Sequence, residues 1–225
     1  MSLNSRSLLA AGTIVVGTLF TACADATVAP LAPDFAAPSM VLTSTVNVNQ
    51  YLEREKNRIK LAQEQSKPAY DSLKKEWERL KKRYPNGNPE LLYCDPLQYS
   101  ADTKIIGPEG GDMSIGPHKL SIPRGALLRP TVITGEMPVS LTVGVQLSQH
   151  GLVFQKDVKL TLSYKHCNRP NTFAEQVVYV DNNNRILERP KSVDKGSDGL
   201  VEAIIRHFSG YMVSSGRHAA SEDAF

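Results

Sequence analysis

The sequence predicts an antiparallel all-β domain, a β-sandwich, preceded by a helical segment and a signal peptide. In residues 141–147 and 158–164, apolar and polar side chains alternate, as they do in strands with one buried face. Clusters of Gly, Pro, Asn and Asp separate these runs from further short apolar runs. Residues 49–85 are instead rich in Glu, Lys, Arg and Gln, which favour helix.

The predicted β domain spans residues 95–215. Further candidate strands are the short apolar runs 103–106, 118–122, 131–137, 176–181, 185–189, 200–206 and 209–214. Turns are predicted between them where Gly, Pro, Asn and Asp gather, for example at Gly110 and Gly111, which allow a positive φ. Many short strands at close spacing favour an antiparallel sandwich or barrel.

Residues 49–85 are predicted to form one charged helix or a kinked pair of helices. Leu73, Trp77, Leu80 and Tyr84 fall on one helical stripe, and Pro68 should kink or split the run. Tyr51–Arg83 holds 11 Lys and Arg against 6 Asp and Glu. The helix could pack its Trp77 stripe on the β domain or on another chain, or its basic face could touch an anionic glycan or lipid surface. The formal net charge of +3, without a recognition motif, gives no indication of nucleic acid.

The first 22 residues are typical of a signal peptide. Arg6 precedes the uncharged run Leu8–Ala22, which would extend about 22 Å as a helix, short of a hydrocarbon core of about 30 Å. Residues 23–48, rich in Ala, Pro, Thr, Ser and Val, are interpreted as a flexible tether. Residues 216–225 are expected to form a disordered tail.

Cys23 is the candidate lipidation site. Leu19 to Cys23 resembles a bacterial lipobox, although Phe20 stands where leucine is usual. Lipidation would anchor the chain to a membrane of the bacterial cell envelope. Cleavage after Ala24 or Ala26, giving a secreted protein, and a retained anchor helix are the alternatives.

Cys94 and Cys167 remain once Cys23 is lipidated or removed. Two cysteines in an oxidising compartment favour one disulfide, and two separate buried thiols are the alternative. Neither cysteine lies in a C-x-x-C pair, which makes a zinc or redox site unexpected.

Three segments together resemble a ZU-5-type domain, the family named from zonula occludens proteins and netrin receptors. They are I-G-P-E-G-G-D-M-S-I followed by H-K-L-S-I-P-R-G-A-L at 106–127, H-G-L-V-F-Q-K-D-V-K-L-T-L-S-Y at 150–164, and H-F-S-G-Y at 207–211. The resemblance covers about residues 99–214, and Asp157 stands where the family often has proline. It implies a β-sandwich that serves in protein interaction or scaffolding.

The resemblance also implies one possible chemistry. In certain relatives a His-Phe-Ser sequence in the closing strand cleaves itself, which here would involve His207, Phe208 and Ser209. Ser209 Oγ would attack the Phe208 carbonyl with help from His207, and water would release the ester. The alternative is that Phe208 is a core residue whose neighbours make hydrogen bonds at a strand end.

Common catalytic and nucleotide-binding motifs are absent from the sequence, and the five histidines show no metal-ligand spacing. No cofactor and no metal are therefore expected. The sequence favours a non-enzymatic, exported or membrane-tethered interaction module. Self-cleavage, or binding of anionic envelope glycan or lipid through the basic helix, are the alternatives.

Overall fold

The computed structural model describes residues 48–86, 92–149, 152–169, 174–181 and 185–215. All of these belong to one of the chain's two compact units, residues 36–225. The predicted signal peptide (1–22), most of the tether (23–48) and the tail (216–225) lie outside the described residues.

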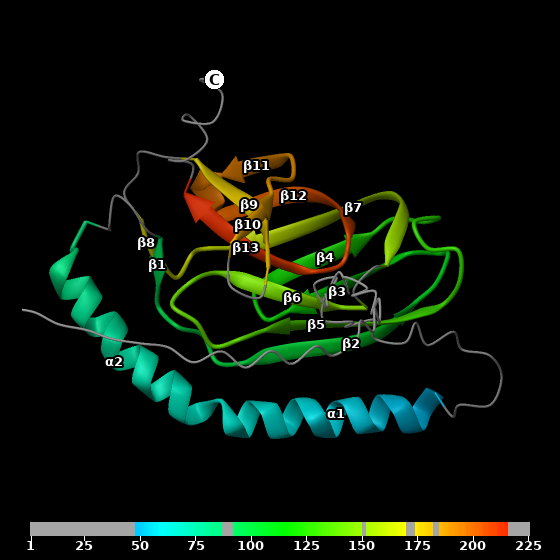
Figure 1. Ribbon diagram of the computed structural model, residues 1–225, viewed down its shortest axis with the longest axis horizontal. Helices are drawn as coiled ribbons and strands as arrows, with labels where there is room; N and C mark the ends of the chain where they lie inside the picture. Colours follow the sequence, from blue (N-terminus) through cyan, green and yellow to red (C-terminus); the bar gives the residue numbers. More distant parts are fainter. Residues whose placement is uncertain (1–47, 87–91, 150–151, 170–173, 182–184, 216–225) are drawn as a thin grey trace, which may run out of the picture. The chain divides into compact units, whose positions relative to one another are not determined.

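The charged segment forms two helices, α1 (Val48–Gln65) and α2 (Lys67–Arg83), which are shown in blue and cyan-green in Figure 1. They meet at Ser66, and Pro68 lies in the first turn of α2, where a missing N–H costs no helical hydrogen bond. Helix α1 contacts strand β2 (Ser100–Ile106), and α2 contacts strand β1 (Tyr93–Cys94). Of the residues of these helices, Trp77 alone is buried, which places the predicted stripe of α2 against the β domain.

Antiparallel strands account for most of the remaining described chain (Figure 1). One sheet has the order β10-β9-β13-β6-β5-β2, and the second has the order β11-β12-β7-β4-β3. The six strands of the first sheet are β2 (Ser100–Ile106), β5 (Thr131–Met137), β6 (Gly144–Ser148), β9 (Glu175–Val180), β10 (Ile186–Glu188) and β13 (Gly210–Ser215). The five strands of the second are β3 (Gly111–Ile115), β4 (His118–Ile122), β7 (Val153–Ser163), β11 (Ser192–Lys195) and β12 (Leu200–His207).

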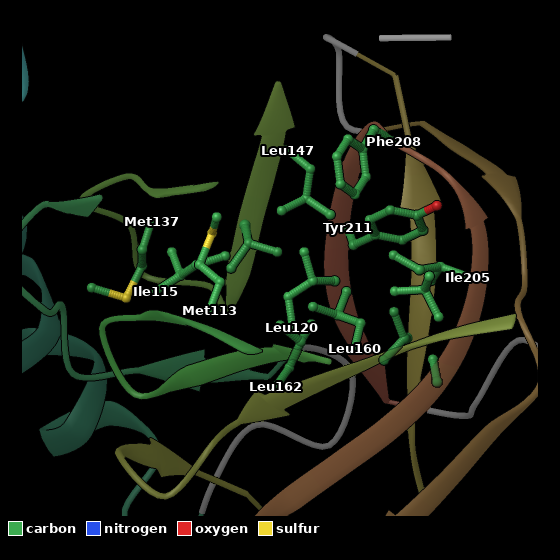
Figure 2. Close-up of a cluster of buried hydrophobic side chains, with 14 of the residues drawn as sticks. Met113, Ile115, Leu120, Met137, Leu147, Leu160, Leu162, Ile205, Phe208 and Tyr211 are labelled. Carbon is green, nitrogen blue, oxygen red and sulfur yellow. The ribbon is translucent and has the colours of Figure 1, made fainter. Parts of the chain in front are cut away.

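One hydrophobic core receives side chains from both sheets. In β4 and β12 every second side chain is buried, which follows from the two-residue period of a strand. Figure 2 shows Leu120, Leu160 and Ile205 from the five-stranded sheet together with Leu147 and Tyr211 from the six-stranded sheet. The predicted fold class is therefore confirmed in its coarse form, as a mostly antiparallel β-fold with two helices.

Cys94 and Cys167 form the predicted disulfide. They are direct register partners in a separate small sheet of β1 (Tyr93–Cys94) and β8 (Cys167–Asn168). Helix α2 reaches this sheet through the Lys74–Asp95 ion pair and through Asn168, whose Nδ2 donates to the Tyr84 carbonyl at 2.9 Å. The disulfide therefore joins the segment that follows α2 to the chain just beyond β7.

Two details of the sequence prediction change. The alternating run 141–147 becomes a strand only from Gly144, which pairs with Met212 of β13. Before it, the Leu141 carbonyl accepts the Cys94 N–H at 2.8 Å instead of a partner in the six-stranded sheet. The positive φ predicted for the turn at residues 107–111 is found at Gly110 but not at Gly111. A Cβ on Gly110 would lie 2.4 Å from the Ile122 carbonyl oxygen, so glycine is required there.

Candidate functional site

His207, Phe208 and Ser209 lie where the chain crosses from the five-stranded to the six-stranded sheet. Strand β12 ends at His207, and β13 begins at Gly210. The Phe208 ring is buried and meets Phe154 edge-on, with ring centroids 4.9 Å apart, and Figure 2 shows it pointing into the core. The Ser209 carbonyl accepts the Leu147 N–H at 3.0 Å. The Phe208 side chain and the Ser209 carbonyl, one on each side of the Phe208–Ser209 bond, are thus both held by contacts.

The His207 imidazole is engaged away from Ser209. Its Nε2 lies 3.1 Å from Glu188 Oε2, and its Nδ1 lies 3.4 Å from the Tyr211 hydroxyl, which donates to the His207 carbonyl at 2.7 Å. Among the described residues no hydrogen bond joins this imidazole to the Ser209 hydroxyl. Self-cleavage would require the imidazole to turn from Glu188 toward Ser209, and it stays a prediction.

Beside the same crossover lies a cavity of about 510 Å³, here called the β12 pocket. Its lining includes Asp157 and Lys159 from β7, Glu202 to His207 from β12, and the connecting segment Glu188–Lys191. That segment leaves β10 in one sheet and enters β11 in the other. Val193 and Ile204 also line the pocket, and both are exposed, at 56% and 38%.

The charges of the β12 pocket are unevenly paired. Each lining acid has a partner: Asp157 pairs with Arg206 at 2.9 Å, Glu188 with His207 at 3.1 Å, and Glu202 with Lys195 at 3.0 Å. Arg189 and Lys191 form no ion pair with any described residue, and the Nη1 of Arg189 is buried without a hydrogen-bond partner. The pocket therefore has positive charge to offer to a ligand.

One edge of β12 is also open in this pocket. The Ile204 N–H donates to the Lys191 carbonyl at 3.2 Å, after which the connecting segment turns away at Pro190. Strand β12 continues to His207, but β11 pairs with it only as far as Ala203, so beyond Ile204 no described strand lies along the side of β12 that faces away from β7.

Cys94, His166 and Cys167 lie close together, but the disulfide prevents the two cysteines from acting as metal ligands. His166 and the two sulfurs of Cys94 and Cys167 have ligand atoms within 4.8 Å of one another. Since both sulfurs are joined in the disulfide, neither is a thiolate, and only the imidazole could coordinate a metal in the oxidised protein. The site is therefore structural in this redox state.

The predicted lipidation site is not part of the described structure. Cys23 lies outside the described residues, and no helix of the described part of the chain is long and apolar enough to cross a membrane. Sequence reasoning missed the β12 pocket altogether. Its one signal in the sequence was Pro190 shortly after Ile186 and Leu187, because proline is unfavourable inside a sheet. The unpaired state of Arg189 depends on tertiary contacts and has no sequence signal.

Neither a protein-family model nor a curated protein matches this chain.

Proposed function

We propose that this chain is a non-enzymatic interaction module, exported or tethered to a membrane, whose folded part is a ZU-5-like β-sandwich. The observation that carries the proposal is the apolar surface around the β12 pocket. Val193 and Ile204 are exposed inside it, and Ile186 and Leu187, at 41% and 55% exposed, lie on the short edge strand that leads into its wall. Exposed apolar side chains gathered at sheet edges are typical of protein contact sites.

Export is supported by two features that do not depend on the resemblance. The sequence begins with an apolar run typical of a signal peptide, followed by Cys23 in a lipobox-like context. The Cys94–Cys167 disulfide is a bond favoured in oxidising compartments. A tether and two helices would then hold the β domain away from the membrane surface.

The test is capture of partners from envelope extract by the purified mature protein. The Ile204→Asp variant, which places a charge on the exposed apolar surface, should lose a partner that the unaltered protein captures. Leu128→Asp is the matched control, because Leu128 is 79% exposed and does not line the β12 pocket. Equal capture by all three proteins would contradict the proposed surface.

The first alternative is self-cleavage between Phe208 and Ser209. It is favoured by the contacts of the Phe208 ring and of the Ser209 carbonyl, which would hold the two residues in place. In this reaction Ser209 Oγ would bond to the Phe208 carbonyl carbon, and the peptide nitrogen would leave as the new amino group. Water would then hydrolyse the resulting ester. A denaturing gel of protein matured in its own host should show two bands, and one band for Ser209→Ala; a single intact band for both would exclude the reaction.

The second alternative is binding of anionic glycan or lipid by the helices. It is favoured by the last turn of α2, where Lys81, Lys82 and Arg83 lie together and exposed. Binding to anionic vesicles should weaken steeply with added salt. Deletion of residues 49–85 should abolish it, and unchanged binding would exclude this alternative.

A further inference from the structure

We propose that the β12 pocket binds the carboxylate-bearing end of an extended peptide, seated on the open edge of β12 with its carboxylate against Arg189 and Lys191. This inference rests on the proposed interaction function and specifies the chemistry of its partner. Three independent observations meet in the pocket: an unpartnered guanidinium nitrogen, an unpaired strand edge and exposed apolar side chains.

The unpaired positive charges of Arg189 and Lys191 indicate that the ligand of the β12 pocket is an anion. A buried donor without a partner is costly, and a charged one more so, which means that a ligand satisfying Arg189 Nη1 gains a strong interaction. Protein acids do not fill this role, because Asp157, Glu188 and Glu202 already have their own cations or imidazole. A carboxylate matches the planar guanidinium, and Lys191 adds a second positive charge.

The strand edge indicates a peptide. Beyond Ile204 no described strand lies along the side of β12 that faces away from β7. An extended chain can pair with such an edge and place alternate side chains on one face. The exposed Val193 and Ile204 would receive these side chains.

A free small carboxylate would use only part of this site. It could pair with Arg189, but it would leave the open edge of β12 beyond Ile204 and the exposed Val193 and Ile204 without contacts. A pocket of about 510 Å³ falls in the usual range for ligand sites and is larger than one carboxylate needs. We therefore assign the site to a peptide and treat succinate as a competing outcome of the test.

The experiment measures binding of labelled probe peptides by fluorescence anisotropy. The probe is a hexapeptide of alternating valine and threonine with a free C-terminal carboxylate. One comparison peptide is its C-terminal amide, and another is that amide with one internal glutamate, so that the two comparisons distinguish a terminal from a side-chain carboxylate. One carboxylate peptide should bind at least about tenfold more tightly than the plain amide, because a hydrogen bond to a charged group contributes about 1.5–3 kcal/mol.

Variants locate the binding. Arg189→Gln and, separately, Lys191→Gln should each weaken binding of the tighter peptide, Arg189→Gln by about tenfold or more. Arg129→Gln removes the same charge from an exposed position that does not line the pocket, and it should bind as the unaltered protein does. Amide hydrogen exchange in the last residues of β12, Ile205 to His207, should slow when the peptide binds, which binding of a carboxylate alone to Arg189 would not cause.

Several outcomes would overturn the proposal. They are equal binding of the carboxylate and amide peptides, binding insensitive to Arg189→Gln, succinate binding as tightly as the peptide, or no binding of any probe. If these occur while Ile204→Asp still abolishes partner capture, the interaction function stands and only the carboxylate assignment falls. If capture is also unaffected, the surface itself is wrong.

Discussion

Glu175 begins β9 with a carboxyl group that is only 2% exposed and has one oxygen without a hydrogen-bond partner. Burial raises its pKa to about 7, because removal from water disfavours the charged form. Arg169, whose Nη1 lies 3.9 Å from Glu175 Oε1, opposes this shift, and the carboxylate of Asp194 reinforces it. One guanidinium thus serves two carboxyl groups, since Arg169 Nη1 also lies 3.7 Å from Asp194 Oδ2.

The raised pKa predicts how Glu175→Gln changes stability with pH. From the ordinary value of 4.5 up to about 7, the unfolded chain releases a proton that the folded protein keeps, so stability is lost as pH rises through that window. Glu175→Gln should therefore be more stable than the unaltered protein at pH 8, by up to about 3 kcal/mol, and nearly equal to it at pH 4. Urea unfolding at both values measures this.

Glu202→Gln is the control for Glu175→Gln. Glu202 lies near Lys195 and Lys159, which lower its pKa, so its neutral replacement should give no gain at pH 8. A gain for Glu175→Gln that is the same at both pH values would contradict the titration of a buried acid.

His118 should give the opposite pH dependence. It is 2% exposed, its Nδ1 accepts the Ser163 N–H at 3.0 Å, and burial lowers its pKa to about 4, with a smaller contribution from His166. Below pH 6.5 the His118 imidazole binds a proton in the unfolded chain, whereas in the folded protein it stays neutral down to about pH 4. The free energy of unfolding therefore decreases as the pH falls through this window.

His118→Asn tests this because an amide oxygen can accept the same N–H without titrating. The variant should lose less stability than the unaltered protein between pH 7 and pH 4, the difference being up to about 3 kcal/mol. Urea unfolding across this range measures the slopes. Parallel slopes for the two proteins would contradict the assignment to His118.

At the scale of elements, the disulfide closes a sequence separation of 73 residues between strands that contain only two residues each. Restricting an unfolded loop of this size stabilises the folded state by about 4 kcal/mol in the chain-entropy account. The double variant Cys94→Ser, Cys167→Ser should lose that amount in urea unfolding. Dithiothreitol should lower the free energy of unfolding of the unaltered protein but not that of the variant. An equal decrease in both proteins would contradict the stabilising role of this disulfide.

Helix α2 is held to the β domain through Trp77, which is 6% exposed in a helix with no other buried side chain. Trp77→Ala should cost about 3 kcal/mol, because it removes a large buried ring and leaves a cavity. Amide hydrogen exchange along α2 should speed up more than exchange in β7 and β12. Leu61→Ala in α1 is the control: its side chain is 53% exposed, so the change should stay within about 0.5 kcal/mol.

Local sequence patterns explain why individual helices and strands could be predicted, whereas the pairing of the strands and the pocket could not. The alternation in residues 158–164 requires only a strand with one buried face, and Pro68 requires only a helix break, so both are readable without tertiary contacts. The order of strands in each sheet, the β1–β8 pairing and the burial of Glu175 all depend on contacts between residues far apart in the chain. The wall of the β12 pocket also depends on such long-range contacts, because it forms where residues 188–191 pass from one sheet to the other.

At the scale of the whole described fold, the two edges of the six-stranded sheet differ in what covers them. Helix α1 lies against the edge strand β2, and its Arg58 reaches Glu136 of the neighbouring strand β5 at 2.8 Å. At the opposite end of the same sheet, β10 keeps Ile186 and Leu187 exposed. Covering one edge with a helix guards it against unwanted pairing, whereas an uncovered apolar edge is suited to binding.

The export proposal makes a prediction for the whole chain that one measurement can check. Protein matured in its own host should have a mass that corresponds to a chain beginning at Cys23, increased by acyl groups and lacking the two hydrogens of the Cys94–Cys167 disulfide. A chain beginning at Asp25 or Thr27 would indicate secretion without an anchor, because cleavage would have removed the candidate lipidation site. A chain still carrying Met1 to Ala22 with both thiols reduced would contradict export, since signal removal and an oxidising compartment are both required by it. The same spectrum distinguishes self-cleavage from a purely structural role of His207 and Ser209. A fragment that ends at Phe208 requires cleavage. A mass that includes Phe225 means that His207 and Ser209 only make structural contacts, with Glu188 and Tyr211 for the imidazole and with Leu147 for the Ser209 carbonyl.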